Sequence, residues 1–261
     1  MNSHSSPESS RSESSRSESS SVLGVPVENP RLILHVLSGD LWGGSEAQMA
    51  MQLSAMRERG LDVRALFLNE GDVSKRFAER GIPCVFADER RGFLSCFRIL
   101  RRHIRSLRPS LLLSHGYKEN ILTSVCSVLY GIPWIPVFHG FREKFQGLKA
   151  KKAWLYYQAS EFLARVRACR IITVSRALAQ DLKLERDGRL RVVRNVVNLG
   201  RNAPERSRIA EFVPPTSKSL IFIGRLVKVK RGDLLIEAFA RLKDLNSHLL
   251  LVGEGPEEEA W

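Results

Sequence analysis

Along residues 31–200, short runs of apolar residues alternate with segments in which apolar residues recur every three or four positions. The first pattern is typical of strands buried on both faces, and the second predicts amphipathic helices. Strands that alternate with helices favour a parallel sheet covered on both sides, so we expect an α/β, doubly wound domain over residues 30–200. The expected strands are Arg31–Ser38, Leu61–Leu68, Pro83–Ala87, Leu111–Ser114, Ile135–Phe138, Arg170–Val174 and Arg191–Val197, and the expected helices are Ser45–Arg59, Val73–Arg80, Phe93–Leu107, Asn120–Tyr130, Leu148–Ala168 and Arg176–Lys183.

The pattern breaks at residues 201–217, where three prolines stand among polar residues, as is typical of a linker. It restarts over residues 218–261 with an expected strand Ser219–Ile223, helix Gly232–Leu245 and strand His248–Val252. This stretch is shorter than the about 50 residues that an independent domain usually needs. One such unit also leaves a parallel sheet with bare edges. We therefore interpret residues 218–261 as the start of a second domain of the same kind, which is incomplete.

Residues 1–29 form a tail that begins mainly with serine, glutamate and arginine. Because such a segment can bury almost nothing, we expect it to be disordered. It also lacks the apolar run of a signal peptide. Nowhere do 18 apolar residues follow one another, so no transmembrane helix is expected.

The four cysteines, Cys84, Cys96, Cys126 and Cys169, lie far apart and form no C-x-x-C motif. Their spacing argues against a zinc site and against a disulfide framework. We expect each cysteine to be a small buried hydrophobe and the protein to reside in the reducing cytoplasm.

The chain contains 41 lysines and arginines and 28 aspartates and glutamates, a formal net charge of +13. This charge favours an anionic partner, whether phosphate, nucleotide, nucleic acid or anionic lipid. Residues 93–107 and 142–170 combine basic side chains with apolar or aromatic ones, and such segments could rest on an anionic membrane. They would equally fit a core-facing stripe with a solvated basic back, and the sequence leaves both interpretations open.

The loop after the first expected strand contains Gly43-Gly44-Ser45-Glu46. The two glycines let the backbone approach a ligand closely, and the following helix start offers free N–H groups that suit a phosphate. Alternatively, this is a glycine turn with Ser45 as the helix cap. A nicotinamide dehydrogenase is disfavoured because the loop lacks G-x-G-x-x-G and no acidic residue ends the second strand.

Two histidines follow expected strands: His115 precedes Gly116 after the fourth strand, and His139 precedes Gly140 after the fifth. Ligands of open parallel sheets bind beyond the carboxyl ends of the strands. Either imidazole could therefore hydrogen-bond a substrate hydroxyl or phosphate. We take His139 as the stronger candidate, although a lone histidine is more often a satisfied structural group.

In the second unit, Gly224, Arg225 and Lys230 follow the first expected strand. The fork of Arg225 and the point charge of Lys230 could clamp a diphosphate between them. A solvated basic loop is the alternative. The later turn Gly253-Glu254-Gly255-Pro256 would, on its own, be an ordinary turn.

Taken in their order along the chain, these glycine, histidine and cation motifs resemble those of glycosyltransferase family 4, the group 1 glycosyltransferases, which are retaining enzymes of the GT-B fold. The resemblance begins near Arg31 and continues to the end of the chain. It rests mainly on Gly224-Arg225 with Lys230, on the glycine-rich turn that follows, and on the Gly-Gly-x-Glu loop at residues 43–46. Residues 137–140 (VFHG), 172–175 (ITVS) and 193–197 (VRNVV) also match.

The resemblance implies catalytic roles for three residues. His139 would line the reaction centre and hydrogen-bond the donor sugar, while Arg225 and Lys230 would neutralise the leaving diphosphate. Other matching glycines, together with one glutamate, would bind substrate near the donor pyrophosphate, the acceptor or the nucleobase. These are Gly43, Gly44, Glu46, Gly224, Gly253 and Gly255.

The resemblance also implies a GT-B-like fold, with a complete N-terminal Rossmann-like domain and an incomplete second one. The implied reaction moves a sugar, with retention, from a nucleotide-diphosphate sugar to a glycan or lipid-linked acceptor, as in lipopolysaccharide or exopolysaccharide biosynthesis. No metal or other cofactor is implied. Peripheral contact with an anionic membrane would suit a lipid-linked acceptor.

The family's paired-glutamate motif and its final helix have no counterpart before Trp261. We therefore expect a C-terminally truncated chain that has little activity by itself. The alternative is a non-catalytic remnant that binds a nucleotide or a partner protein. Nucleic acid is not expected, because its binding modules need no such order of glycines and cations at strand ends.

Overall fold

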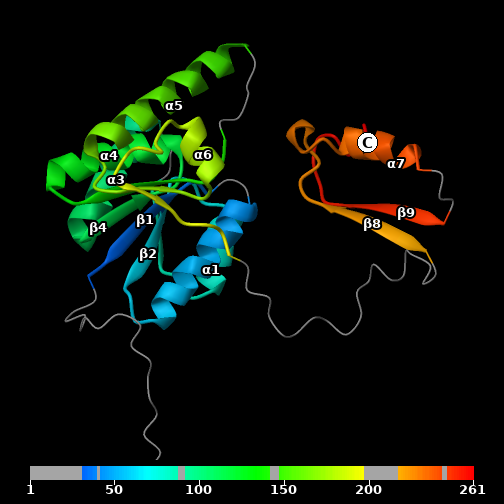
Figure 1. The fold of residues 1–261 in the computed structure, drawn as a ribbon. Coiled ribbons are helices and arrows are strands. Elements are labelled where there is room, and N and C mark those ends of the chain that lie inside the picture. The colour runs from blue at the N-terminus through cyan, green and yellow to red at the C-terminus, as the bar shows by residue number, and fades with distance from the viewer. Residues whose placement is uncertain (1–30, 40–41, 88–91, 142–146, 197–216, 243–245) are drawn as a thin grey trace, which may run out of the picture. The chain divides into compact units, whose positions relative to one another are not determined.

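The computed structural model describes residues 31–39, 42–87, 92–141, 147–196, 217–242 and 246–261. The chain divides into two compact units, Met1–Val197 and Asn198–Trp261 (Figure 1). The expected disordered tail, residues 1–29, lies outside the described residues. So does all of the expected linker, residues 201–217, except Ser217.

Within its described residues, the first unit contains a seven-stranded parallel sheet with the order β3-β2-β1-β4-β5-β6-β7. The chain moves outward from β1 to β3 and then returns past β1 to β4. This doubly wound order reverses between β1 and β4, which is where ligands usually bind in sheets of this kind. The strands are β1 Ile33–Leu37, β2 Val63–Phe67, β3 Cys84–Phe86, β4 Leu111–Ser114, β5 Trp134–Phe138, β6 Ile171–Thr173 and β7 Leu190–Val192.

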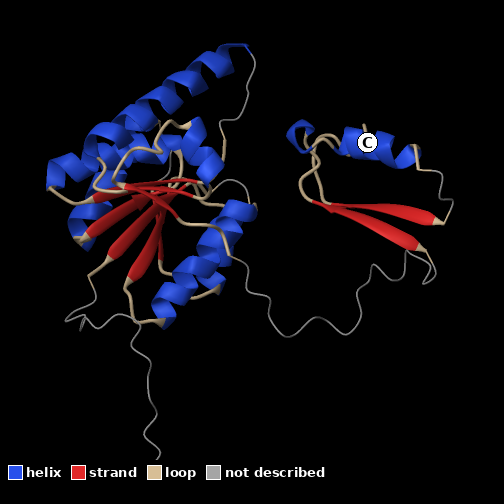
Figure 2. Ribbon diagram, viewed as in Figure 1, coloured by secondary structure: helices blue, strands red, loops and turns tan. Residues whose placement is uncertain are grey.

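Helices pack on both faces of this sheet (Figure 2). Leu37 of β1 packs with the core side chains of α1 and α2, whereas Leu34 and Val36 pack with those of α3, α4, α5 and α6. This division follows from the strand geometry, because successive residues of a strand point to opposite faces. None of the helices in the described part of the chain is long and apolar enough to span a membrane. The helices are α1 Gly44–Glu58, α2 Asp72–Glu79, α3 Phe93–Leu107, α4 Tyr117–Tyr130, α5 Gly147–Arg167 and α6 Arg176–Asp181.

Helix α4 begins three residues earlier than the sequence predicts, at Tyr117 instead of Asn120. Gly116 is its N-cap residue, and Gly131, with φ of +64°, ends it in the left-handed conformation that glycine favours. The early start places Glu119 in the first turn, where its side chain is buried. The first three residues of α4, Tyr117, Lys118 and Glu119, therefore lie at the carboxyl edge of the sheet.

The second unit is a β-α-β arrangement, as the sequence predicts. Strands β8 Lys218–Ile223 and β9 Ser247–Val252 pair in parallel along their whole length. Helix α7 Gly232–Ala240 connects them, preceded by a 3-10 turn at Lys228–Lys230 that the sequence pattern did not predict. Helix α7 is shorter than the expected helix over residues 232–245, since Arg241 is its C-cap residue.

Two further expectations are wrong. The strand expected over residues 191–197 is shorter: β7 ends at Val192, the described residues 193–196 are not strand, and the N–H of Val196 donates to Oε1 of Gln48 on α1. Cys169 is exposed, whereas Cys96 and Cys126 are buried as expected and Cys84 is half-buried.

Candidate functional site

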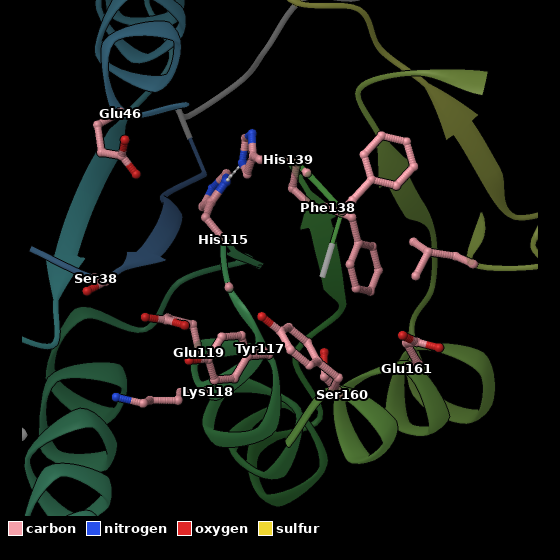
Figure 3. A pocket seen from close by; sticks show the side chains of 16 residues that line it. Ser38, Glu46, His115, Tyr117, Lys118, Glu119, Phe138, His139, Ser160 and Glu161 are labelled. Atoms are coloured by element: carbon pink, nitrogen blue, oxygen red, sulfur yellow. Dashed lines mark hydrogen bonds between the residues drawn. The ribbon is translucent and has the colours of Figure 1, made fainter. Parts of the chain in front are cut away.

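A pocket of about 400 Å³ lies at the carboxyl edge of the sheet, next to the reversal between β1 and β4 (Figure 3). Of the sequence candidates, Glu46, His115 and His139 line it, whereas Gly43 and Gly44 are not among its described lining residues. The rest of the wall comes from the end of β5, from residues that follow β1, β4 and β5, from the first turn of α4, from α5 and from the region just after α6. These residues are Ser38, Gly116, Tyr117, Lys118, Glu119, Val137, Phe138, Gly140, Phe141, Tyr157, Ser160, Glu161 and Leu182.

Three histidines form one hydrogen-bonded row across the sheet. Nδ1 of His35 lies 2.9 Å from Nε2 of His115, and Nδ1 of His115 lies 2.9 Å from Nε2 of His139 (Figure 3 shows the second bond). The register explains the first contact, since His35 pairs with Leu113, and residues two apart on a strand share a face. The sequence interpretation missed His35, although a histidine inside an otherwise apolar strand was a visible signal.

Burial keeps the three imidazoles neutral near neutral pH. It lowers the pKa of His35 to about 4 and the pKa of His139 to about 4. The pKa of His115 lies well below its usual range because the ring is buried and because charge on either neighbouring histidine would repel its own. Each neutral ring therefore carries one N–H donor and one acceptor nitrogen.

Helices α1 and α4 begin in the same way, with a Gly-x-x-Glu sequence. A Cβ on the N-cap residue Gly43 would lie 3.0 Å from Oε2 of Glu46, and one on Gly116 would overlap the Glu119 carboxylate. A carboxylate in this position is stabilised by the positive end of the helix dipole. Ser45 does not cap α1, since its hydroxyl donates to Oε2 of Glu46 at 2.8 Å. The two carboxylates make this edge better suited to sugar hydroxyls than to phosphate.

Buried hydrogen bonds fix the part of the pocket wall that α5 supplies. The indole N–H of Trp134 donates to Oγ of Ser114 at 2.7 Å, and the Ser114 hydroxyl donates to Oδ1 of Asn120 at 2.6 Å. The amide of Asn120 then donates to Oγ of Ser160 at 2.9 Å. Because these four residues belong to β5, β4, α4 and α5, the network holds Ser160 and its neighbour Glu161 at the pocket.

The sequence interpretation also missed an aromatic cluster beside the pocket. The ring of Tyr117 lies 4.7 Å from that of Tyr157 and 6.0 Å from that of Tyr156, measured between centroids. Both α5 tyrosines, which belong to the segment that could either rest on a membrane or face the core, are half-buried against α4. Tyr117 directly follows His115-Gly116, which was a usable signal, whereas Ser160 and Glu161 lie in mid-helix and carry none.

In the second unit, Arg225 and Lys230 are exposed between β8 and α7. Neither side chain has an ion pair or hydrogen bond with another described residue. By contrast, Arg231 pairs with Asp233, with Nε 3.2 Å from Oδ1. Arg225 and Lys230 are therefore available for an anion.

The predicted substrate-binding glycines of the second unit lie on two loops that pair with each other. The N–H of Gly224 donates to the carbonyl of Val252 at 3.0 Å, and the N–H of Leu226 donates to that of Glu254 at 2.9 Å. A Cβ on Gly255 would overlap the backbone of Leu226. Close packing between these loops is thus one reason for glycine here, whatever ligand they meet.

Within the described residues, no group of three or more His, Cys, Asp or Glu is arranged to hold a metal ion.

The sequence model of glycosyltransferase family 4 matches residues 42–201, which is more than half of the chain. The chain belongs to glycosyltransferase family 4. The model of glycosyl transferases group 1 matches residues 205–260, so the two matches follow each other along the chain as the two units do. No curated protein matches this family 4 member significantly.

Several solved structures, two of them of proteins named as glycosyltransferases, share its fold. HepE from Anabaena, in complex with UDP-glucose, has 16% identity and a TM-score of 0.69, and the match covers 86% of this chain and 61% of HepE. A glycosyltransferase from Rickettsia africae has 17% identity and a TM-score of 0.66, with 86% and 61% covered. The lipopolysaccharide outer core galactosyltransferase WaaB in its apo form has 14% identity and a TM-score of 0.58, with 87% and 62% covered.

This family 4 chain therefore spans less than two thirds of the length of these structures. The expected GT-B-like fold is confirmed, with a doubly wound Rossmann-like domain followed by one β-α-β unit of a second domain. Of the predicted site residues, Glu46 and His139 meet in the pocket of the first unit. Arg225, Lys230 and the three glycines Gly224, Gly253 and Gly255 belong to the second unit.

Proposed function

We propose that this family 4 protein transfers a sugar from a nucleoside diphosphate sugar to a hydroxyl group of a glycan or lipid-linked acceptor, with retention of configuration. The pocket at the carboxyl edge of β1, β4 and β5 supports this most strongly. Its carboxylates and histidines are groups that hydrogen-bond hydroxyls, and Nδ1 of His139 is buried without a partner among the described residues. A sugar hydroxyl would provide that partner.

In the proposed reaction, the bond between the sugar C1 and the phosphate oxygen breaks while the acceptor oxygen bonds to C1 from the same face. The acceptor proton goes to the leaving phosphate. Arg225 and Lys230 stabilise the negative charge that develops on the diphosphate, a part that fixed cations can perform without a metal ion. As the family resemblance implies, Gly43 and Gly44 would lie near the donor pyrophosphate and the acceptor, and Gly253 and Gly255 beside the nucleobase, with Glu46 and Gly224 as further substrate-binding residues.

Titration with UDP by calorimetry tests the two cations. Arg225→Ala and Lys230→Ala should each weaken binding by roughly tenfold or more, because hydrogen bonds to charged groups contribute about 1.5–3 kcal/mol. Lys228→Ala is the matched control, since Lys228 is an exposed cation on the same turn. Affinities that fall equally in all three variants, or in none, would count against a diphosphate clamp.

UDP release from UDP-glucose, measured with and without a panel of glycan acceptors, separates a transferase from a non-catalytic binding protein. Acceptor-dependent UDP release supports transfer. UDP binding without release under any acceptor is the outcome expected both of the non-catalytic alternative and of a transferase chain with little activity by itself.

A second proposal is that α3, α4 and α5 rest on an anionic membrane at its cytoplasmic face. The side chains of Arg98, Arg101, Arg102 and Arg105 on α3 are exposed and line a groove of about 630 Å³. On α4, which packs beside α3, and on α5, which packs beside α4, several large apolar side chains are exposed. These are Val125, Val128, Leu129, Trp154, Leu155, Phe162 and Val166. Basic groups next to exposed apolar ones bind anionic lipid surfaces.

Sedimentation with phosphatidylcholine vesicles, with and without phosphatidylglycerol, tests this contact. Arg101→Glu with Arg105→Glu should abolish binding to the anionic vesicles. The control pair Arg59→Glu with Lys75→Glu reverses as much charge on the opposite face of the sheet. Equal loss in both pairs would indicate net charge alone, and unchanged binding would exclude this surface.

A further inference from the structure

The histidine row ends in two unsatisfied nitrogens. Nε2 of His35 and Nδ1 of His139 are both buried without a hydrogen-bond partner among the described residues, while the four ring nitrogens between them are paired. His35 is only 3% exposed and belongs to the middle of β1, so it cannot touch a ligand in the pocket. It can act on the pocket only through His115 and His139.

The two internal bonds must run in the same direction. A neutral imidazole has one N–H and one acceptor nitrogen, so a ring that accepts on one side must donate on the other. In one direction all three rings carry their proton on Nε2, and in the opposite direction all three carry it on Nδ1. The tautomer of His35 therefore fixes the tautomer of His139 two bonds away.

The intrinsic tautomer preference favours the first direction, because Nε2–H is the more stable tautomer of a neutral histidine and all three rings adopt it together. His139 Nε2–H then donates to Nδ1 of His115, and His115 Nε2–H donates to Nδ1 of His35. Nδ1 of His139 is left as an acceptor. An unpaired buried acceptor is costly, and a hydroxyl that reaches it removes the cost.

We propose that His35 and His115 are positioning residues that hold His139 as the Nε2–H tautomer, with its Nδ1 lone pair presented to a ligand hydroxyl. The part of this inference that concerns the hydroxyl rests on the proposed sugar-binding function. The tautomer alignment does not, because it concerns the ligand-free protein. His35 thus becomes part of the site although it lies outside the pocket.

Long-range nitrogen–proton NMR of the protein labelled with nitrogen-15 histidine, at neutral pH and without ligand, tests the alignment. We expect Nε2–H tautomers for His35, His115 and His139, and nitrogen–nitrogen couplings across both hydrogen bonds. His35→Phe keeps a ring but removes the last acceptor, so His139 should shift towards the Nδ1–H form. His35→Asn, whose amide oxygen can accept from His115, should restore the wild-type signals of His139.

His103→Phe is the control, because His103 lies outside the row and bonds to the carbonyl of Phe86. It should leave the three signals unchanged. An Nδ1–H tautomer at any of the three rings in the wild type, or missing couplings, would overturn the proposal, as would a folded His35→Phe protein with unaltered His139 signals. If His35→Phe does not fold, the wild-type tautomers and couplings still decide. Because no sugar is added, these outcomes are independent of the proposed transfer reaction.

Discussion

The carbonyl oxygen of Gly224 lies directly against the α-carbon of Gly253, and the contact leaves no room for a side chain on Gly253. The backbone of Gly253, with φ of +155°, also has a conformation that residues with a Cβ rarely adopt. The contact joins the ends of β8 and β9, where the two loops pair. The fold of the second unit therefore requires glycine at position 253, whether or not this residue contacts a nucleotide.

Gly253→Ala should unfold the end of the β8–β9 sheet. Backbone strain of this kind costs about 1–3 kcal/mol, and a sheet of two strands has little stability to lose. Hydrogen exchange followed by mass spectrometry should show reduced protection over β8 and β9 and unchanged protection over β1 and β4. Gly188→Ala is the control, because a Cβ there meets no atom within 4 Å. Full protection of β8 and β9 in Gly253→Ala would contradict this account.

Asn120→Leu should destabilise the first unit by about 2–6 kcal/mol, because it removes an acceptor from Ser114 and a donor from Ser160, and each buried unpaired group costs about 1–3 kcal/mol. The free energy of unfolding in urea measures the loss. Val128→Ala, at a half-exposed position on the same helix, should change it by no more than about 0.5 kcal/mol. A loss below about 1 kcal/mol for Asn120→Leu would mean that water replaces the network.

The histidine row should make the protein less stable in mild acid. The pKa of His35 is lowered by burial to about 4, whereas an unfolded histidine titrates near 6.5, so the unfolded state binds more protons between these values. The stabilising contribution is complete above about pH 6.5 and is lost as the pH falls towards about 4. For His35 alone, the stability lost by about pH 5 is roughly 2 kcal/mol.

Urea unfolding at about pH 7.5 and about pH 5 measures this difference. His35→Phe removes one of the groups that titrate, so the difference between the two pH values should shrink by that amount. If the wild type is equally stable at both, the three rings are not held neutral in the folded protein.

The fold was largely predictable because buried parallel strands read as apolar runs. Phe93–Leu107 and Leu111–Ser114 were predicted with the bounds that the structure gives. The prediction of an element failed where tertiary contacts decide the local structure. At Val196, for example, the N–H donates to Gln48 on α1 and not to a strand.

The candidate site was predictable only at strand ends and at the helix starts that come after them: His139 directly follows β5, and Glu46 lies in the first turn of α1. His35 was visible as a histidine within an apolar strand but was read as part of the core, because the hydrogen-bonded row depends on a register between strands that are distant in sequence. Ser160 and Glu161 reach the pocket from the middle of α5, and only packing places them there. The sequence therefore indicated that the site lies at the carboxyl ends of the strands, but not which side chains line the pocket there.

Gly44→Ala separates the structural from the proposed ligand-binding reason for glycine at the start of α1. A Cβ on Gly44 would meet no atom within 4 Å, and Gly44 is the first residue of the helix. Alanine should therefore preserve the melting temperature or raise the free energy of unfolding by up to about 1 kcal/mol. If the backbone approaches the donor here, the same methyl group should weaken UDP-glucose binding by roughly tenfold, a loss of about 1.4 kcal/mol. Stable protein with unchanged affinity for UDP-glucose would remove Gly44 from the substrate-binding residues and leave Glu46 as the contribution of this loop to the pocket.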